Sequence, residues 1–277
     1  MLKKAYVEIT NVCNLACPFC RGTARQPYEM APTDFYTVAA KLRPYTDYIY
    51  LHLLGEPLRH TRLDEILAIC KELRYKVTVV TNGTLIGRAA PVLLDCGCLY
   101  KIAFSLHAYE ANALPQPLED YLMPILRFAR ESAQTGVINV LKLWNGGGRN
   151  ALNETILRRI EAYFDSPLAP HRGGYTVTQN VFIDLADRFT WPDLAAGETP
   201  PRFCMALRDQ IGVLADGTAV PCCLDADGAL RLGSLLTDGV EEILNGERAK
   251  RIKEGFSQGR AAEPLCRRCD FAKRRFG

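Results

Sequence analysis

The sequence predicts an α/β protein: a largely parallel sheet, open or curled into a barrel, followed by a smaller cysteine-rich part. Two observations support this prediction. Apolar, β-rich runs alternate with helix-like stretches over the first two-thirds of the chain, as in folds built from strand–helix units. The last third has only short strand, turn and helix signals, and it holds five of the eleven cysteines. A chain of 277 residues is long enough for one large domain and one small one.

Six apolar runs are the expected strands. They cover residues 5–10, 48–54, 76–81, 101–106, 137–143 and 181–185. Residues 77–80, Val-Thr-Val-Val, are continuously apolar in character and do not alternate with charged residues. This pattern suits strands whose two faces are both covered, as in a parallel sheet between helices.

Five helix-like stretches separate these runs. They cover residues 33–42, 63–73, 86–94, 118–135 and 154–164. Thr33 is expected to cap the first helix, and Asn153 to cap the last one after the glycine break at residues 146–148, because both side chains can accept a backbone N–H bond.

The alternation stops at residues 165–203, which are rich in proline and glycine and are expected to be a connection. Beyond them, two short apolar runs flank Asp216-Gly217, a strong signal for a hairpin formed by residues 211–214 and 218–220. Two short helices are expected at residues 240–244 and 249–256.

Composition and charge are those of an ordinary globular protein, with 48% hydrophobic and 23% charged residues. The net charge of +3 is too small to indicate nucleic-acid binding without a clustered basic face. No signal-peptide pattern is visible, and no apolar stretch approaches the roughly 20 residues of a membrane span. We therefore expect a cytoplasmic protein with no membrane partner. In that reducing compartment, clustered cysteines indicate metal ligands more than disulfides.

Three cysteines, Cys13, Cys17 and Cys20, lie on one loop directly after the first expected strand. Thiolates select iron–sulfur clusters or zinc. Three protein ligands would leave one iron of a four-iron cluster open, and an open position is typical of a reactive metal site. The alternative is a zinc knuckle completed by a distant cysteine or histidine.

Four later cysteines form a second candidate metal site: Cys204, Cys222, Cys266 and Cys269. Four thiolates can complete the coordination of a cluster or of zinc, so a structural zinc ribbon is the alternative. Cys223 adjoins Cys222 and is an alternative ligand. Three other cysteines lie in apolar stretches and are expected in the core: Cys70, Cys96 and Cys98.

The first cysteine loop, Cys-x-x-x-Cys-x-Phe-Cys, resembles the signature of the radical S-adenosylmethionine (SAM) superfamily. Gly55-Glu56-Pro57 is similar to the family's Gly-Gly-Glu-Pro motif, with Leu54 in place of the first glycine. The resemblance implies that this segment binds the methionine amino group of SAM. It implies cofactor contacts for three further residues: Phe19, Asn82 and Ser105.

The resemblance also implies the fold and the chemistry. Members of the family fold as a partial (β/α)6 barrel, similar to a TIM barrel, with the active site at the carboxyl ends of the strands. Their [4Fe-4S] cluster cleaves SAM reductively to a 5′-deoxyadenosyl radical, which abstracts hydrogen from the substrate. The cofactors carry this step, and the protein binds and orients them. We expect an electron donor such as flavodoxin or ferredoxin.

The later cysteines resemble the SPASM/Twitch extension of the same superfamily, which carries auxiliary [4Fe-4S] clusters. The full SPASM pattern has seven cysteines, and no cysteine follows Cys269, so a short version with a single auxiliary cluster is expected. Residues 1–190 would then be the radical SAM core, and residues 191–277 a small α+β auxiliary iron–sulfur domain.

Two histidines and one lysine near the expected strand ends are candidate catalytic residues: His52, His107 and Lys142. Histidine exchanges protons near neutral pH, and a charge late in a strand is costly unless it faces a wet cavity. The alternatives are hydrogen-bonded structural histidines and a lysine that reaches solvent.

By analogy with the SPASM/Twitch group, a peptide or protein is the expected substrate, and a small metabolite or nucleotide is the alternative. A hypothesis of another class is a non-catalytic zinc or iron–sulfur protein that binds nucleic acid through its basic tail. Five cationic residues lie in that tail: Arg267, Arg268, Lys273, Arg274 and Arg275. This hypothesis predicts salt-sensitive binding of RNA or DNA without SAM cleavage.

Overall fold

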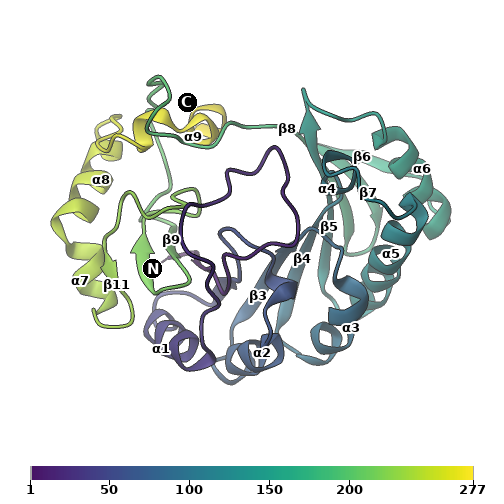
Figure 1. Ribbon diagram of the computed structural model, residues 1–277, viewed down its shortest axis with the longest axis horizontal. Helices are drawn as coiled ribbons and strands as arrows, with labels where there is room; N and C mark the ends of the chain where they lie inside the picture. The colour runs from purple at the N-terminus through teal and green to yellow at the C-terminus, as the bar shows by residue number, and fades with distance from the viewer. Residues whose placement is uncertain (1, 277) are drawn as a thin grey trace. The chain divides into compact units, whose positions relative to one another are not determined.

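The structure is a computed structural model that describes residues 2–276 (Figure 1). The chain divides into two compact units. The first contains the chain up to Asn14, Cys20–Tyr75 and the chain from Phe189 onwards, and the second contains Leu15–Phe19 and Lys76–Arg188. These are packing units, so the domain division at residue 190 stays a prediction.

The strands of the first unit lie in the order β11-β10-β9-β1-β2. They are β1 (Lys4–Val7), β2 (Tyr48–Tyr50), β9 (Gln210–Val213), β10 (Thr218–Val220) and β11 (Gly233–Ser234). β1 pairs in parallel with both β2 and β9, whereas β10 is antiparallel to both β9 and β11. The predicted C-terminal hairpin is confirmed, and its first strand extends the sheet begun by the N-terminal strands.

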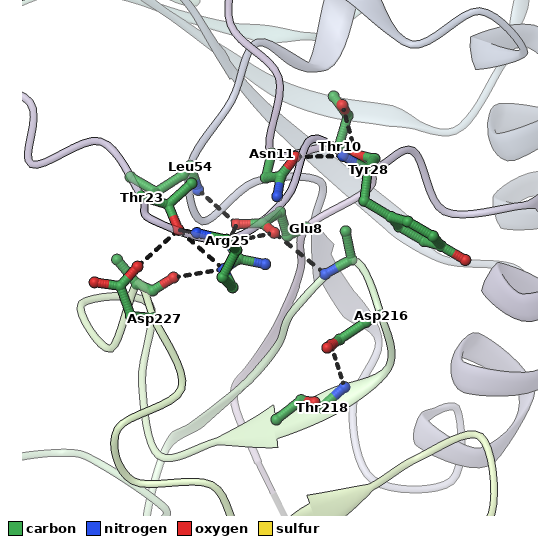
Figure 2. Close-up of polar contacts among 12 residues, drawn as sticks. Glu8, Thr10, Asn11, Thr23, Arg25, Tyr28, Leu54, Asp216, Thr218 and Asp227 are labelled. Atoms are coloured by element: carbon green, nitrogen blue, oxygen red, sulfur yellow. Dashed lines mark hydrogen bonds and ion pairs between the residues drawn. The ribbon is translucent and has the colours of Figure 1, made fainter.

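The turn between β9 and β10 explains the hairpin. Gly217 has a φ of +83°, a left-handed conformation that glycine adopts without steric cost. The Asp216 carboxylate accepts a hydrogen bond from the backbone N–H of Thr218 at 2.9 Å (Figure 2). Ile211 and Val213 of β9 are fully buried, so apolar burial adds to the pairing of β9 with β1.

The helices of the first unit include the four that the sequence predicts and three short additions. The predicted ones are α1 (Pro32–Leu42), α2 (Leu63–Glu72), α7 (Val240–Asn245) and α8 (Glu247–Ser257), and the additions are η1 (Pro57–Arg59), η2 (Cys266–Arg268) and α9 (Asp270–Phe276). The cap predicted at Thr33 was wrong, because α1 begins at Pro32 after Ala31 and no side chain caps it. Proline suits the first helical position, where its missing N–H would have no helical partner.

The second unit contains four parallel strands followed by two antiparallel ones, in the order β3-β4-β5-β8-β7-β6. The strands are β3 (Lys76–Thr81), β4 (Leu99–Ser105), β5 (Ile138–Gly146), β6 (Ala169–His171), β7 (Gly174–Thr178) and β8 (Val181–Asp187). The helices are α3 (Ile86–Asp95), α4 (Ala108–Ala111), α5 (Leu118–Gln134) and α6 (Asn153–Phe164). α3, α5 and α6 cover one face of this sheet (Figure 1), where Phe104 meets Phe128 with ring centroids 6.0 Å apart. The α/β prediction is confirmed as a mixed sheet, and neither unit closes its strands into a barrel.

Two predictions in the second unit were wrong. Residues 165–203 are more than a connection, because β6 and β7 form a hairpin within them around Gly173, whose φ is +87°. Pro170 within β6 and Gly174 at the start of β7 conceal the strand pattern. Asn153 is the first residue of α6 and does not cap it. Its side-chain amide instead exchanges two hydrogen bonds with that of Asn145, at 2.8 and 3.0 Å.

The apolar residues largely behave as predicted. Cys70 and Cys98 are buried, whereas Cys96 is half-buried and its thiol donates to the carbonyl oxygen of Leu93 at 3.2 Å. Within residues 2–276, no helix is both long enough and apolar enough to cross a membrane.

Candidate functional site

Hydrogen bonds in the first unit tie the two ends of the first cysteine loop together. Asn11 Nδ2 donates to the carbonyl oxygen of Gln26 at 2.8 Å, and Asn11 Oδ1 accepts from the N–H of Tyr28 at 2.7 Å. Thr10 Oγ1 donates to the carbonyl oxygen of Tyr28 at 3.1 Å (Figure 2). The side chains of Cys13 and Cys20 within this segment are exposed.

The Gly-Glu-Pro segment, residues 55–57, packs on the chain that leads into the loop. Gly55 has a φ of +73°, and a Cβ at this position would lie 2.2 Å from the carbonyl oxygen of Thr10. The N–H of Glu56 donates to the carbonyl oxygen of Val12 at 3.0 Å. The Glu56 side chain is buried, and its Oε1 accepts from the N–H of Leu58 at 3.0 Å. Glycine is required at position 55 because a Cβ atom there would clash with the backbone of Thr10, which follows β1.

In the second unit, Cys17 is held by a residue that the sequence did not reveal. Asn112, directly after α4, donates from Nδ2 to the Cys17 sulfur at 3.0 Å. Its Oδ1 accepts from the N–H of Ala16 at 3.2 Å. One amide side chain therefore hydrogen-bonds to both the Cys17 thiol and the backbone N–H of Ala16. No local pattern marks Asn112, since α4 is too short to predict and the contact spans 95 residues.

Phe19, the aromatic residue of the cysteine loop, packs against His107 with the two rings tilted. Their ring centroids lie 4.7 Å apart at an interplanar angle of 50°. His107 is buried, and its Nδ1 lies 3.1 Å from the carbonyl oxygen of Lys142 and 3.3 Å from the backbone nitrogen of Trp144. Burial lowers the pKa of His107 to about 4, so the ring is neutral at neutral pH. This geometry suits a residue that supports Phe19 and β5.

Asn82 lies in the turn after β3, and its side chain is engaged in that turn. Its Oδ1 accepts from both the backbone N–H and the hydroxyl of Thr84, at 3.0 and 2.6 Å. The Asn82 carbonyl oxygen accepts from the Tyr121 hydroxyl at 2.7 Å. These bonds fix the conformation of the turn, which lies at the carboxyl end of β3.

Polar residues at one register of three adjacent strands form a row in the second unit. Ser105 of β4 pairs with Lys142 of β5, which pairs with Asp184 of β8. Phe104 faces α5, so Ser105 points away from the helices, because successive side chains of a strand alternate. Trp144 joins the row: its Nε1 donates to Asp184 at 3.0 Å, and the Lys142 ammonium lies 4.2 Å from its ring centroid. The sequence analysis missed Asp184, although a carboxylate that interrupts an apolar run is a usable signal.

His52 belongs to an aromatic group in the first unit. Its ring centroid lies 5.5 Å from that of Tyr6 and 5.9 Å from that of Tyr50. The Lys4 ammonium lies over the same two tyrosine rings, at 5.3 and 5.2 Å. These contacts fit a packed histidine beside the carboxyl end of β2.

The four later cysteines come together in the first unit. They line one cavity, although Cys204 and Cys269 lie 65 positions apart in the sequence. The rest of its wall is largely apolar and comprises Pro192, Ala206, Leu224, Asp225, Leu230, Phe256, Leu265 and Ala272. The cavity thus collects four soft donors in a largely apolar pocket, which is the donor set of an iron–sulfur cluster or zinc.

Burial holds the four thiols of this cavity in their neutral form. Burial raises the pKa of all four thiols, that of Cys269 to about 11, and the neighbouring thiols add to the effect at Cys222. Metal binding would replace the thiol protons and ionise the sulfurs. Within residues 2–276, no group of three or more Cys, His, Asp or Glu side chains has the geometry to hold one metal ion. In a four-iron cluster each thiolate binds a different iron, so the sulfurs need not converge on one ion.

Cys223 has different surroundings from Cys222. It packs against the cluster that contains Tyr6 and Val220, and its thiol is hydrogen-bonded to the Tyr6 hydroxyl. It does not line the cavity, whereas Cys222 does. The geometry therefore favours Cys222 over Cys223 as a ligand.

Arginines of the basic tail are paired within the chain. Arg267 and Arg268 both contact Glu198 at 3.0 Å, and Arg274 contacts Asp270 at 2.7 Å. These pairs neutralise part of the charge on which the nucleic-acid hypothesis depends.

Two parts of the chain match models of known families. Residues 7–164 match the Radical SAM superfamily, and residues 204–270 match SPASM, an iron–sulfur cluster-binding domain. The chain belongs to the radical SAM superfamily. The predicted resemblance is confirmed for both segments. Its cofactors are a [4Fe-4S] cluster and SAM, with an auxiliary iron–sulfur cluster in the SPASM domain.

One curated relative supports the same assignment. This radical SAM protein is 31% identical over 117 residues to GTP 3′,8-cyclase of Synechococcus sp. (strain CC9902). The match covers 39% of this chain and 33% of the cyclase, so the chain spans about a third of the length of that relative.

Solved structures share the fold at low sequence identity. The structure of BtrN in complex with AdoMet and 2-DOIA superposes with a TM-score of 0.63 at 16% identity, covering 97% of this chain and 93% of BtrN. SuiB of Streptococcus suis bound to S-adenosylmethionine gives 0.64 at 16% identity, covering 98% and 72%. The anSMEcpe structure with bound AdoMet gives 0.62 at 12% identity, covering 90% and 82%.

The donor sets of this radical SAM protein fit two clusters. The loop offers three thiols, one short of the four that saturate a four-iron cluster, and the cavity offers four. A loop with three ligands leaves one iron for a bound cofactor, whereas a cavity with four closes its cluster.

Proposed function

We propose that this protein cleaves SAM reductively at a [4Fe-4S] cluster held by Cys13, Cys17 and Cys20, and uses the product to abstract hydrogen from a substrate. The observation that carries this proposal is the family match over residues 7–164, which contains the tied cysteine loop. When bound, the cluster and SAM supply a 5′-deoxyadenosyl radical, and the protein binds, orients and shields them.

The residues around the loop have distinct roles in this proposal. Gly55, Glu56 and Pro57 bind the methionine end of SAM, since their backbone lies against the entry to Cys13. Phe19 packs on the adenine and is held in place by His107. Asn82 presents the turn after β3, and Ser105 binds the ribose or carboxylate of SAM.

Lys142 is the residue we propose for contact with the substrate or the SAM carboxylate. It lies half-buried on the face of the second unit's sheet that points away from α3, α5 and α6, between Ser105 and Asp184. The low pKa of His107 favours a supporting role over proton transfer. His52 is kept as a candidate acid–base group at the end of β2.

The four cavity cysteines, Cys204, Cys222, Cys266 and Cys269, hold the single auxiliary [4Fe-4S] cluster in this proposal. Their joint exposure to one cavity supports it. We also propose that residues 1–190 and 191–277 are the functional division, a radical SAM core and a SPASM/Twitch-like auxiliary domain. Flavodoxin or ferredoxin in the cytoplasm would supply the electron.

For the substrate, we propose a peptide or protein. Two structures with the same fold contain peptides: SuiB bound to precursor peptide SuiA, and anSMEcpe with Cp18Cys peptide. The alternative is a small metabolite or nucleotide, since the BtrN structure contains 2-DOIA, and one relative is a GTP 3′,8-cyclase. Peptide and metabolite panels, each followed by mass spectrometry for a loss of hydrogen, separate these proposals.

The test of the reaction is anaerobic. Reconstituted protein is expected to bind about eight irons, in two four-iron clusters, and to release 5′-deoxyadenosine from SAM with dithionite. Cys17→Ala is expected to abolish the product, whereas Cys96→Ala, at a cysteine outside both sites, retains it. A wild-type protein that binds only zinc and leaves SAM intact would overturn the proposal.

A further inference from the structure

The chain that leaves Cys20 is fastened to the loop that follows Cys222. The carboxylate of Asp227 accepts hydrogen bonds from Arg21 at 3.0 and 3.2 Å. It also accepts from the Thr23 hydroxyl at 2.7 Å (Figure 2) and from the N–H of Ala24 at 3.3 Å. One side chain therefore binds three residues of the segment directly after the first cysteine loop. All four bonds are charge-assisted by the carboxylate, and the two from Arg21 also join opposite charges.

Arg21 also reaches a second wall of the cysteine-lined cavity. Its Nη1 donates to the carbonyl oxygen of Pro192 at 3.0 Å, and Pro192 lines that cavity. The Arg21 guanidinium thus contacts two segments that border the auxiliary site: the loop that contains Asp227 and the segment that contains Pro192. Its planar fork of donors suits such a double contact.

The loop that carries Asp227 also contributes residues to the cavity wall. Asp225 lines the cavity and accepts from the N–H groups of Ala229 and Leu230, both at 2.8 Å. Leu230 also lines the cavity. Asp227 therefore lies next to the cavity wall along the chain, because only one residue separates it from Asp225.

A buried ion pair between Arg25 and Glu8 holds the segment after Cys20 at a second point. Arg25 donates to Glu8 at 2.9 Å and to the carbonyl oxygen of Ala226 at 3.0 Å. Glu8 is fully buried and accepts from the N–H groups of Leu54 and Ala215, each at 3.2 Å. Figure 2 shows Glu8, Arg25, Leu54, Thr23 and Asp227 as one continuous network. Its bonds reach the residue before Gly55, so the network touches the SAM motif as well.

We propose that Arg21 and Asp227 are positioning residues that couple the auxiliary cluster site to the Cys20 end of the SAM-binding loop. This inference rests on the proposed function. Occupation of the cavity holds the loop of Asp227 in place, and Asp227 in turn holds the chain beside Cys20. Such a contact is a coupling between two sites, and coupling free energies of this kind typically change affinity by roughly 5- to 150-fold.

The test is a double-mutant cycle on the full chain. It compares the wild type, Asp227→Asn, the pair Cys266→Ala with Cys269→Ala, and the combination, with Asp47→Asn of the exposed Arg43 ion pair as control. The readout is SAM affinity, measured from the electron paramagnetic resonance signal of the reduced SAM-binding cluster. Loss of the auxiliary site is expected to weaken SAM binding at least about fivefold in the wild type and less than about twofold with Asp227→Asn. Equal losses in both backgrounds would overturn the proposal.

Hydrogen exchange on the metal-free protein provides a second readout that does not need the clusters. The Ala24 amide is expected to exchange faster in Asp227→Asn than in the wild type, and unchanged exchange would count against the contact. Asp227→Glu, which keeps the charge, is expected to restore part of the protection. If the wild type fails to cleave SAM, the proposed function fails while the exchange result still stands. If it cleaves SAM but the cycle shows no coupling, this inference fails alone.

Discussion

Asn112 is expected to raise the reduction potential of the SAM-binding cluster. Its Nδ2 lies 3.0 Å from the Cys17 sulfur, and donors to a ligating sulfur stabilise the reduced cluster, which carries one more negative charge. Asn112→Leu keeps the size of the side chain and removes the donor. We expect the reduction potential of the SAM-binding cluster to fall.

The size of the shift follows from the hydrogen bond. A bond to a charged group contributes about 1.5–3 kcal/mol, and about 1.4 kcal/mol corresponds to 59 mV for one electron, so about 130 mV is the upper limit. Only the difference between the two oxidation states moves the potential, so we expect a decrease of roughly 30–60 mV.

The assay is a potentiometric titration of the SAM-binding cluster in a protein whose auxiliary site carries Cys266→Ala and Cys269→Ala. Asn150→Leu, at an exposed asparagine of the same unit, is the control and is expected to leave the potential unchanged. A purely structural role for Asn112 would lower the iron content without a systematic shift in potential. An unchanged or higher potential at full iron content would refute the reasoning.

Three further predictions concern a glycine, a histidine and a cysteine pair. Gly55→Ala places a methyl group 2.2 Å from the Thr10 carbonyl oxygen at a φ of +73°, so we expect the free energy of unfolding in urea to fall by about 2 kcal/mol or more. The control Gly87→Ala, in open space on α3, is expected to be neutral or mildly stabilising. Equal stabilities of the two variants would contradict this. The folded pKa of His107 is about 4, below the unfolded value of about 6.5, so its contribution to the free energy of unfolding is complete above pH 6.5. This contribution falls by about 1.4 kcal/mol per pH unit as the pH drops towards 4. In unfolding experiments, His107→Gln should flatten this slope, and His171→Gln, at an exposed histidine, should not. Cys222→Ala is expected to halve the bound iron to about four atoms, whereas Cys223→Ala keeps about eight, and the reverse result would exchange their roles.

The strand predictions show where local pattern suffices and where it does not. All six predicted strands exist, because a run of buried apolar residues carries its own signal. Their ends are predicted less well: β3 has its predicted bounds, whereas β1 stops at Val7 and β2 at Tyr50. Beyond Val7, the side chains of Glu8 and Thr10 bond to the chain that follows the cysteine loop. The β6–β7 hairpin was missed because β6 is short and exposed and β7 has only one buried residue, Val177, so burial leaves little trace in their composition.

The sequence by itself determined the family, the two cysteine sets and the Gly-Glu-Pro segment. These features are contiguous or nearly so, and their chemistry depends on residue type and spacing, which can be read directly. It also identified the turn at Asp216-Gly217, because the conformation required there is set by two neighbouring residues.

Only the tertiary structure decided which of two adjacent cysteines faces the cavity and that His107 is buried and neutral. It also decided that Asn112 contacts the first cysteine loop and that Asp227 contacts the chain directly after it. The contact of Asn112 with Cys17 joins residues 95 apart, and that of Asp227 with Thr23 joins residues 204 apart. Local propensity carries no information about such pairs, because an asparagine or an aspartate on the surface and one against a ligand loop look alike until the chain has folded around them.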